Sequence, residues 1–500
     1  MSNSLPPRRT NSSPAADPSG GLRPLFVDLD GTLIQTDLLH EAILALLWRS
    51  PGKMLGLLPE LRRGRAAFKR AVSRHITPDL AALPYRTDVL DFVRSRRDQG
   101  GKIILATASD AEWAVRISEE LGLFDHILAS DGVRNCKGPE KLAQIREHCR
   151  QEGATRFDYI GDSLSDLPVW REAEGVYLAG PSPAMLRRVA REVTPTAILG
   201  THQAPWAALA RALRPHQWVK NLLVFVPLVA SQGWGEPRLI FAAFVCLLCF
   251  CLCASAVYLL NDLVDLQSDR RHPVKQHRPL ASGALPVWSG PVFAAGLLGI
   301  AVALSMLFLP PLTALWLVLY FGGNCLYSLV IKRVAMLDVL TLAALYTSRL
   351  FAGASAVEVE VSEWLAAFSM FLFTSLAFAK RYAELDRLLR SQQEVARGRG
   401  YRAADISLVE SAGLANGYIA VLVLALYLNS PAAKSLYRQT WSLWLVCIVL
   451  MYWIGRIWLK AKRGELTEDP LVFALRDRAS LWLGLVLVVL VGAAIVGIPK

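Results

Sequence analysis

The chain has 500 residues, of which 53% are hydrophobic, and its mean hydropathy is +0.34. A chain of this length usually forms more than one domain, and the apolar stretches that recur after about residue 218 exclude a purely soluble protein. The 54 basic and 42 acidic residues give a net charge of +12, which fits either nucleic-acid binding or a membrane protein with basic loops on one face. Eight cysteines in a chain of this length do not indicate a disulfide framework.

The N-terminal part of the chain divides into two segments. Residues 1–21 are rich in Ser, Pro, Asn and Gly, so we expect a disordered segment, and they lack the apolar stretch of a signal peptide. The segment 22–200 alternates short apolar runs with helical patterns, which predicts an α/β domain with buried parallel strands. These runs are Leu25–Val27, Ile103–Leu105 and Phe157–Ile160.

Helix-like sequence at 38–95 predicts a helical insertion into this domain, and we expect a linker at 201–211. The segment 212–500 is predicted to be an all-α polytopic membrane domain with about nine transmembrane helices. Its apolar runs are long enough for a hydrocarbon core of ~30 Å at a rise of ~1.5 Å per residue. The candidate spans are 218–234, 238–261, 288–309, 311–331, 337–356, 362–379, 407–428, 440–459 and 480–498.

Basic residues are distributed unevenly between the loops of this membrane domain. The loops after the second, fourth, sixth and eighth spans are rich in Lys and Arg, whereas the loops between them hold only Arg238, Lys434 and Arg438. This asymmetry predicts a multi-pass protein of the cell (inner) membrane whose N-terminal domain and active sites face the cytoplasm. It also explains the positive charge without a nucleic-acid partner.

Acidic and phosphate-binding residues follow three of the predicted strands. Asp28 and Asp30 come after the first strand, where one carboxylate can attack phosphorus while the other protonates the leaving oxygen and later activates water. The hydroxyl of Thr107 ends the second strand and can hold a phosphoryl oxygen, and Lys141 can neutralise phosphoryl charge.

Two further carboxylates, Asp162 and Asp166, follow the third strand. Because the carboxyl ends of parallel strands meet at one edge of a sheet, we expect them to join Asp28 and Asp30 there. Carboxylate oxygens are the ligands that Mg²⁺ prefers, so all four are candidate metal ligands.

This ordered set resembles the haloacid dehalogenase superfamily of phosphatases over about residues 24–185. The resemblance implies a Rossmann-like fold in which 38–95 is the family's helical cap. It implies Asp28 as nucleophile, Asp30 as acid/base, Thr107 and Lys141 as phosphoryl-binding residues, and Asp162 and Asp166 as Mg²⁺ ligands. Ser109 remains an alternative to Thr107.

A second acidic group lies where the second span leaves the membrane. Asn261 and Asp262 are followed by Asp265 and Asp269, and the three aspartates fall on one face of a helix. Such a cluster at a membrane boundary needs positive charge, which Mg²⁺ bridging a diphosphate would supply; the alternative is an ordinary acidic loop. Candidate substrate-binding residues on the same side are Arg270, Arg271, Lys275, Arg278, Tyr327, Lys332 and Arg333.

This region resembles the UbiA family of membrane prenyltransferases over nearly all of 212–500. The resemblance implies that Mg²⁺, held by Asp262, Asp265 and Asp269, helps to draw diphosphate off a carbon that becomes cationic, with Asp262 and Asp265 in catalysis. Commoner family members carry a second aspartate-rich cluster after the sixth span. Here that loop begins with Lys380 and Arg381 and is basic.

The segment Arg214–Asn221 and the basic loop resemble the decaprenyl-phosphate phosphoribosyltransferase branch of this family. The resemblance implies phosphoribosyl diphosphate as donor and a polyprenyl phosphate as acceptor. The substrate-binding residues that it implies are Lys220, Asn221, Arg349, Lys380, Arg381 and Glu384.

We therefore expect a bifunctional enzyme of cell-wall lipid synthesis that uses Mg²⁺ in both domains. Its membrane half would transfer 5-phosphoribose to a polyprenyl phosphate, and its phosphatase half would remove the 5-phosphate from the lipid product. One alternative is an aromatic prenyltransferase with a quinone-like acceptor, fused to a phosphatase of unrelated substrate. Another is a non-enzymatic lipid carrier, against which the confinement of the acids to one face argues. A homo-oligomer remains open.

Overall fold

The computed structural model divides the chain into two compact units. The first unit consists of Met1–Ala212 and Asp262–Pro291, and the second of Leu213–Asn261 and Val292–Lys500. The structure describes residues 22–202, 204–390, 400–437, 439, 441–466 and 469–496, so the predicted disordered segment lies outside the described residues.

The first unit is built on a six-stranded parallel sheet with the strand order β3-β2-β1-β4-β5-β6. The order reverses between β1 and β4, and at such a switch point the loops after the strands diverge and leave a crevice for ligands. The predicted α/β fold is confirmed. The strands are β1 (Leu25–Val27), β2 (Ile103–Asp110), β3 (His126–Ser130), β4 (Asp158–Gly161), β5 (Gly175–Ala179) and β6 (Ala197–Leu199).

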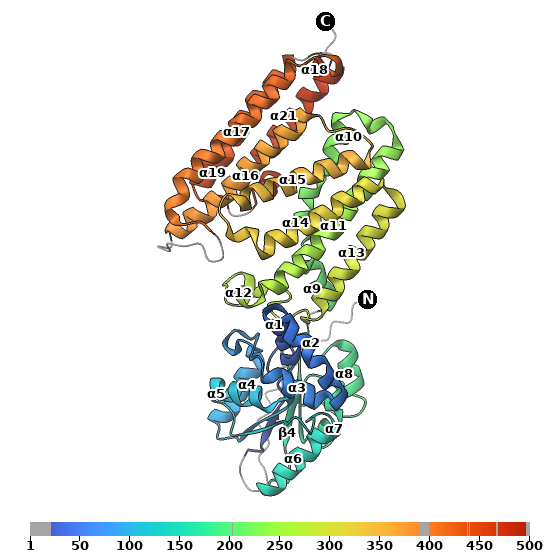
Figure 1. Ribbon diagram of the computed structural model, residues 1–500. Helices are drawn as coiled ribbons and strands as arrows, with labels where there is room; N and C mark the ends of the chain where they lie inside the picture. Colours follow the sequence, from blue (N-terminus) through green and yellow to red (C-terminus); the bar gives the residue numbers. More distant parts are fainter. Residues whose placement is uncertain are drawn as a thin grey trace, which may run out of the picture. The chain divides into compact units, whose positions relative to one another are not determined.

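Helices cover both faces of this sheet because successive strand side chains point to opposite sides (Figure 1). Leu25 and Val27 pack with α4 and α5, whereas Phe26 packs with α6, α7 and α8. All three side chains are fully buried, which explains the continuous apolar runs. The helices are α4 (Thr87–Asp98), α5 (Ala111–Leu121), α6 (Pro139–Gln151), α7 (Leu167–Trp170) and α8 (Pro183–Val189). Helix α9 (Pro205–Ala212) follows the last strand.

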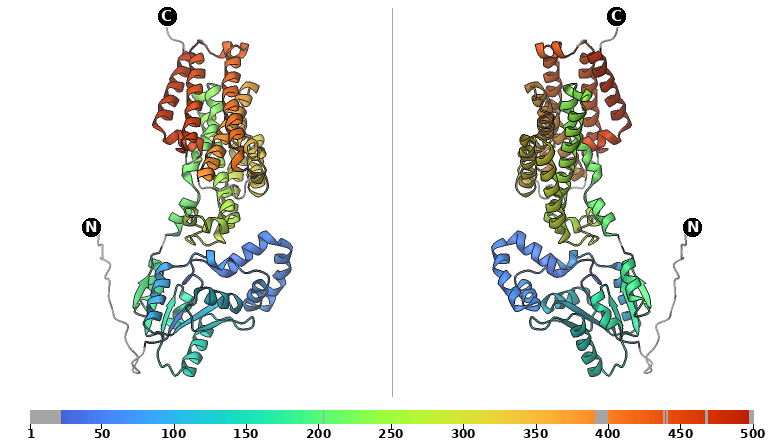
Figure 2. Two further views of the ribbon diagram at one scale, coloured as in Figure 1. Left: turned by 90° about the vertical axis from the view of Figure 1, so that its left-hand side faces the viewer. Right: turned by 90° about the vertical axis from the view of Figure 1, so that its right-hand side faces the viewer.

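Short helices inserted between β1 and α4 form the cap, coloured blue in Figure 2. They are α1 (Leu38–Arg49), α2 (Pro51–Leu57), the 3₁₀ helix η1 (Leu58–Arg63) and α3 (Arg65–Ser73). Asp37 begins α1, because its carboxylate accepts the N–H groups of Leu39 and His40, a cap that contributes ~1 kcal/mol. Helix α4, which the predicted cap 38–95 includes, leads directly into β2 and is the crossover helix of the sheet.

The second unit is a bundle of long apolar helices (Figure 1). Many large apolar side chains on its helices point outward, as expected for surfaces that face lipid. The helices are α10 (Val226–Ala230), α11 (Pro237–Val264), α13 (Ser289–Phe308), α14 (Pro311–Leu329), α15 (Leu337–Ala356), α16 (Glu363–Arg390), α17 (Ile406–Leu428), α18 (Pro431–Leu436), α19 (Trp441–Lys462), α20 (Pro470–Arg476) and α21 (Arg478–Val496), of which α11 and α13 extend into the first unit.

Among the described residues, seven helices are long and apolar enough to cross a membrane. They match seven of the nine predicted spans, so the chain is a multi-pass membrane protein, while the count of nine is not confirmed. The predicted span 218–234 forms the 3₁₀ helix η4 (Pro215–Phe225) followed by the short α10. The predicted span 362–379 lies in α16, whose C-terminal half carries several charged residues.

Candidate active sites

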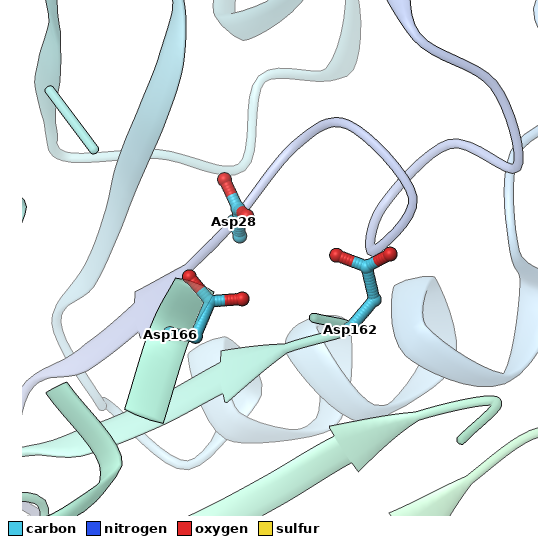
Figure 3. A group of neighbouring side chains, drawn as sticks. All are labelled: Asp28, Asp162 and Asp166. Atoms are coloured by element: carbon cyan, nitrogen blue, oxygen red, sulfur yellow. The ribbon is translucent and has the colours of Figure 1, made fainter. Parts of the chain in front are cut away.

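Three carboxylates converge at the switch point of the sheet (Figure 3). Asp28 follows β1, while Asp162 and Asp166 lie in the turn and the 3₁₀ helix after β4. One oxygen from each lies within 4.8 Å of the others, and among the described residues this is the only such group of three acidic, His or Cys side chains. An all-oxygen donor set of this kind fits Mg²⁺.

A buried lysine partly balances this negative charge. Nζ of Lys141, at the start of α6, lies 2.9 Å from Oδ1 of Asp28 and 3.3 Å from Oδ1 of Asp166. It also donates to Oη of Tyr159 at 2.8 Å, and that hydroxyl donates to Asp166 at 2.8 Å. The ammonium group therefore lies where it can meet a phosphoryl group attached to Asp28.

The second aspartate after β1 contacts β2 through a serine. Oγ of Ser109 donates to Oδ2 of Asp30 at 2.5 Å, and the backbone N–H of Leu38 donates to Oδ1 at 2.9 Å. The hydroxyl of Thr107 is fully buried and accepts the N–H of Ser109. Ser109 therefore contacts the predicted acid/base Asp30, whereas the Thr107 hydroxyl contacts the backbone of Ser109.

The two aspartates after β1 bind protons more readily than in water. Burial raises the pKa of Asp28 to about 6, against the opposing effect of Lys141. Burial and the nearby Asp37 raise the pKa of Asp30 to about 7, although the Ser109 hydrogen bond opposes them. A carboxyl that titrates near neutrality suits a group that first donates and then accepts a proton.

Gly31 permits the turn that follows Asp28 and Asp30. Its φ is +78°, and a Cβ there would lie 2.0 Å from Oδ2 of Asp162. Gly31→Ala should therefore lower both the melting temperature of the full-length protein and its hydrolysis of a small phosphate monoester. The matched control is Gly122→Ala, because Gly122 has a φ of +61° with open space where the Cβ would lie. Backbone strain alone costs about 1 kcal/mol, so equal effects of the two changes would exclude a specific clash with Asp162.

The second acidic group lies in the loop Asp262–Pro291 of the first unit. Asp262 is in the last turn of α11, and Asp269 is in the short helix α12 (Leu266–Arg270). Both are buried, and the Arg278 guanidinium bridges them, at 3.1 Å from Asp262 and 2.5 Å from Asp269. Lys275 approaches Asp269 at 3.9 Å. The predicted continuous helical face is interrupted, because the helix breaks at Asp265 before α12 begins.

Two of the predicted substrate-binding arginines in this loop form ion pairs with residues of the cap region. Arg270 forms a bidentate ion pair with Glu41 of α1, at 2.5 and 3.1 Å, and both side chains are buried. Arg271 pairs with Asp79. Their charge is therefore already matched within the protein.

A polar cluster in the second unit brings together predicted and unpredicted residues. Nζ of Lys220 in η4 lies 2.9 Å from Oδ2 of Asp469, and Nζ of Lys380 in α16 lies 3.4 Å from the same oxygen. Oη of Tyr346 donates to the carboxylate at 2.9 Å. Burial alone would raise the pKa of Asp469, but the two lysines outweigh it and hold the pKa below its usual range.

The predicted residues Arg349 and Asn221 lie in the same unit. Nε of Arg349 donates to the Asn221 side-chain oxygen at 2.8 Å, and Nη2 donates to Oη of Tyr320 at 2.8 Å. The guanidinium also stacks 4.6 Å from the Tyr320 ring and 5.2 Å from the Tyr346 ring. The Arg349 guanidinium is therefore held in place by hydrogen bonds and by two aromatic rings.

Arg381 centres a second polar cluster on α16. Its guanidinium pairs with Asp338 and Glu384, and Nη2 donates to Oη of Tyr327 at 2.8 Å. Oη of Tyr401 donates to Asp338 at 2.8 Å. The predicted residues Arg381, Tyr327 and Glu384 are thus joined, and Asp338 and Tyr401 complete the cluster.

The other predicted residues lie at more open positions. Asn261 is half-buried near the end of α11, Lys332 is half-buried in the 3₁₀ helix η7 (Ile331–Arg333), and Arg333 is exposed there. Sequence analysis missed Asp469 and Tyr346. The one available signal was the pair Asp469-Pro470, which is typical of a helix start, and Asp469 does begin α20.

Comparisons with known proteins match both halves of the chain. The model of the UbiA prenyltransferase family matches residues 222–484, more than half of the chain, and that of the haloacid dehalogenase-like hydrolases matches residues 25–171. These matches confirm both family predictions.

Three curated relatives are similar to this chain. The uncharacterized protein y4nM of Sinorhizobium fredii is 37% identical over 92% of this chain and 89% of its own length. The nodulation protein NoeC of Azorhizobium caulinodans is 35% identical over 55% of this chain and 90% of its own length. The decaprenyl-phosphate phosphoribosyltransferase of Mycobacterium tuberculosis is 29% identical over 58% of this chain and 94% of its own length. The chain belongs to the UbiA prenyltransferase family and carries a haloacid dehalogenase-like hydrolase domain fused before the membrane domain.

Proposed function

We propose that the membrane half transfers 5-phosphoribose from phosphoribosyl diphosphate to a polyprenyl phosphate, and that the hydrolase half removes the 5-phosphate from the lipid product. Both sites are proposed to face the cytoplasm of the inner membrane. Fusion then raises the local concentration of an intermediate that cannot leave the bilayer.

The single observation that carries the proposal is the basic and aromatic cluster around Lys220, Arg349 and Lys380. Phosphoribosyl diphosphate carries an additional phosphate that a prenyl diphosphate lacks, and buried cations are the groups that recognise it. The name of the Mycobacterium tuberculosis relative, decaprenyl-phosphate phosphoribosyltransferase, supports transfer of a phosphoribosyl group to a polyprenyl phosphate.

An apolar cavity of the second unit supports a lipid acceptor. It has a volume of about 450 Å³ and is lined by residues of η4, α11 and α20. Trp218, Leu247 and Leu475 contribute apolar surface, and His216 and Arg476 contribute polar groups. We infer that the cavity takes the first isoprene units of the acceptor, with its phosphate beside the polar groups.

In the hydrolase half, we assign the nucleophile to Asp28 and the acid/base to Asp30, while Lys141 meets the charge on the phosphoryl group. Attack by Asp28 displaces the ribose oxygen, which takes the proton of Asp30, and the deprotonated Asp30 then activates water to free phosphate. Asp162 and Asp166 would hold Mg²⁺, which neutralises phosphoryl charge when bound. In the membrane half, we assign Asp262, Asp265 and Asp269 to the diphosphate and its metal. Among the described residues these three carboxylates do not gather within 4.8 Å of one another, and Arg278 bridges Asp262 and Asp269.

A donor competition tests the proposal. Purified protein in lipid receives a polyprenyl phosphate, a quinone-type aromatic acceptor, Mg²⁺, phosphoribosyl diphosphate and a prenyl diphosphate. The expected lipid product carries ribose, as measured by mass spectrometry. A prenylated aromatic product would instead establish the alternative prenyltransferase activity.

Asp469 is expected to position the two lysines for the donor. Asp469→Asn removes the charge that holds Lys220 and Lys380 together, so KM for phosphoribosyl diphosphate should rise roughly ten- to a hundredfold while kcat changes less. Asp477→Asn is the matched control, because Asp477 forms an ion pair with Arg456 next to the same short helix. An equal rise of KM in both variants would show that Asp469 has no specific role.

A further inference from the structure

The cap carries apolar side chains that its own packing does not use. Leu38, Leu46 and Met54 are buried in the hydrolase core, so amphipathic packing accounts for them. A different set on α1, α2 and η1 points outward. This set, which we call the cap patch, consists of Leu47, Trp48, Leu55, Leu58 and Leu61, whose exposed fractions are 46%, 46%, 63%, 44% and 50%.

The cap patch is surrounded by positive charge. Between residues 47 and 65 the chain has five basic residues and one acid. That acid, Glu60, pairs with Arg63. Leucine and tryptophan side chains beside lysine and arginine are the composition of segments that lie in a membrane interface, where the apolar groups enter the acyl boundary and the cations meet anionic headgroups. The basic residues, all exposed, are Arg49, Lys53, Arg62, Arg63 and Arg65.

The same helix α1 is attached to a loop that leads into the membrane. The buried ion pair between Glu41 and Arg270 is reinforced by the Thr36 hydroxyl, which donates to Glu41 at 2.7 Å. A Cβ on Gly283 would lie 2.4 Å from the backbone oxygen of Gln35, so the loop and the start of the cap are in close contact. Both contacts lie within the first unit.

Arg270, the partner of Glu41 in α1, lies close in sequence to the end of a candidate span. Arg270 follows the last residue of α11, Val264, by six positions, and α11 is one of the candidate spans. Six residues of chain span at most about 22 Å when fully extended, so Arg270 cannot lie farther than that from the end of α11. The loop that ends at Pro291 also continues into a second candidate span, α13.

We propose that the cap patch is a binding surface for an anionic lipid bilayer. The surface is apolar and cationic, which matches acyl chains under acidic headgroups. Helix α1 contacts the loop Asp262–Pro291, which connects the candidate spans α11 and α13. The proposal requires only the hydrolase fold, and it holds whatever donor the membrane half uses. Bound in this way, the cap would let the hydrolase take a phosphate ester that stays in the membrane.

The test measures the depth of a nitroxide label on the full-length protein in nanodiscs. Leu55→Cys carries the label on the cap patch, and Val133→Cys is the control, because Val133 is 88% exposed on the loop after β3. In nanodiscs containing phosphatidylglycerol, we expect the Leu55 label to be accessible to oxygen and shielded from a water-soluble nickel reagent. The Val133 label should show the reverse. The unsubstituted protein, treated identically, gives the background from Cys325.

A charge variant tests whether the cations around the cap patch contribute to lipid binding. Lys53→Glu, Arg62→Glu and Arg65→Glu together should lower the membrane-bound fraction of the Leu55 label by about an order of magnitude. A Leu55 label as exposed to nickel as the Val133 label would overturn the proposal. Spin–spin coupling between Leu55 labels would overturn it as well, because the patch would then join two copies of the chain. Hydrolysis of a small phosphate monoester, measured in parallel, reports separately on the hydrolase assignment.

Discussion

Asp28→Asn should give a protein that still transfers phosphoribose but accumulates the 5-phosphorylated lipid. An amide oxygen is a poor nucleophile toward phosphorus, so the covalent step on this residue should fail. We expect hydrolysis to fall by at least about a thousandfold, which corresponds to roughly 4 kcal/mol of transition-state stabilisation. The measurement is the mass of the lipid product formed from donor and acceptor.

The control for this change is Asp98→Asn, an exposed aspartate of α4 in the same unit. It should form the same dephosphorylated lipid as the unsubstituted protein. Identical product masses for Asp28→Asn and the control would contradict the proposed link between the two halves, whether the 5-phosphate were kept or lost in both.

Asp262→Ala should strongly slow transfer and leave hydrolysis of a small phosphate monoester intact. Asp262 shares the Arg278 guanidinium with Asp269, and its removal takes away one of the carboxylates proposed to hold the metal of the diphosphate. Loss of such a contact costs several kcal/mol, or a rate decrease of roughly a hundred- to a thousandfold.

Gln276→Ala is the matched control for this loop, because Gln276 is exposed between the same spans. Transfer by the purified control should be normal. If Asp262→Ala transferred phosphoribose at a similar rate, the metal-binding role proposed for this carboxylate would be wrong.

The carboxylates of the hydrolase site could be predicted from the sequence because each of them follows a predicted strand. Asp28, Asp162 and Asp166 are far apart in the chain, but parallel strands bring their carboxyl ends to one edge, and the spacing of the apolar runs predicts that edge. Ser109 was identified only as an alternative. Ser109 lies where the register of β2 against β3 shifts, between Ala106 and Asp110, and a residue pattern does not predict its contact with Asp30.

The polar clusters of the membrane half were harder to predict from the sequence because their contacts join helices that are far apart in the chain. Asp469 meets Lys220 and Lys380 across long separations in sequence, and a short acidic segment between two spans gives no indication of its partners. Arg270 was expected to bind substrate from its place beside the acids. It instead pairs with Glu41, an interaction between the cap and a loop more than two hundred residues away.

Two predictions about helix boundaries differ from the structure, and each difference has a physical reason. The helix at the membrane boundary stops at Asp265, so periodicity extended across it overstated the shared face of the three aspartates. The first predicted span, 218–234, contains Pro227, and η4 begins just before the span with Pro215. Each proline removes a backbone donor. This segment forms η4 and the short α10, a division that apolar length alone does not predict.

The most direct test of the bifunctional account follows two labels of one donor. Phosphoribosyl diphosphate carries a carbon label in its ribose and a phosphorus label in its 5-phosphate, and the full-length protein in lipid receives it with a polyprenyl phosphate and Mg²⁺. The account predicts that the carbon label enters the lipid while the phosphorus label passes through the lipid and is released as inorganic phosphate. A lipid that keeps both labels at the end of the reaction, or that gains neither, would contradict it.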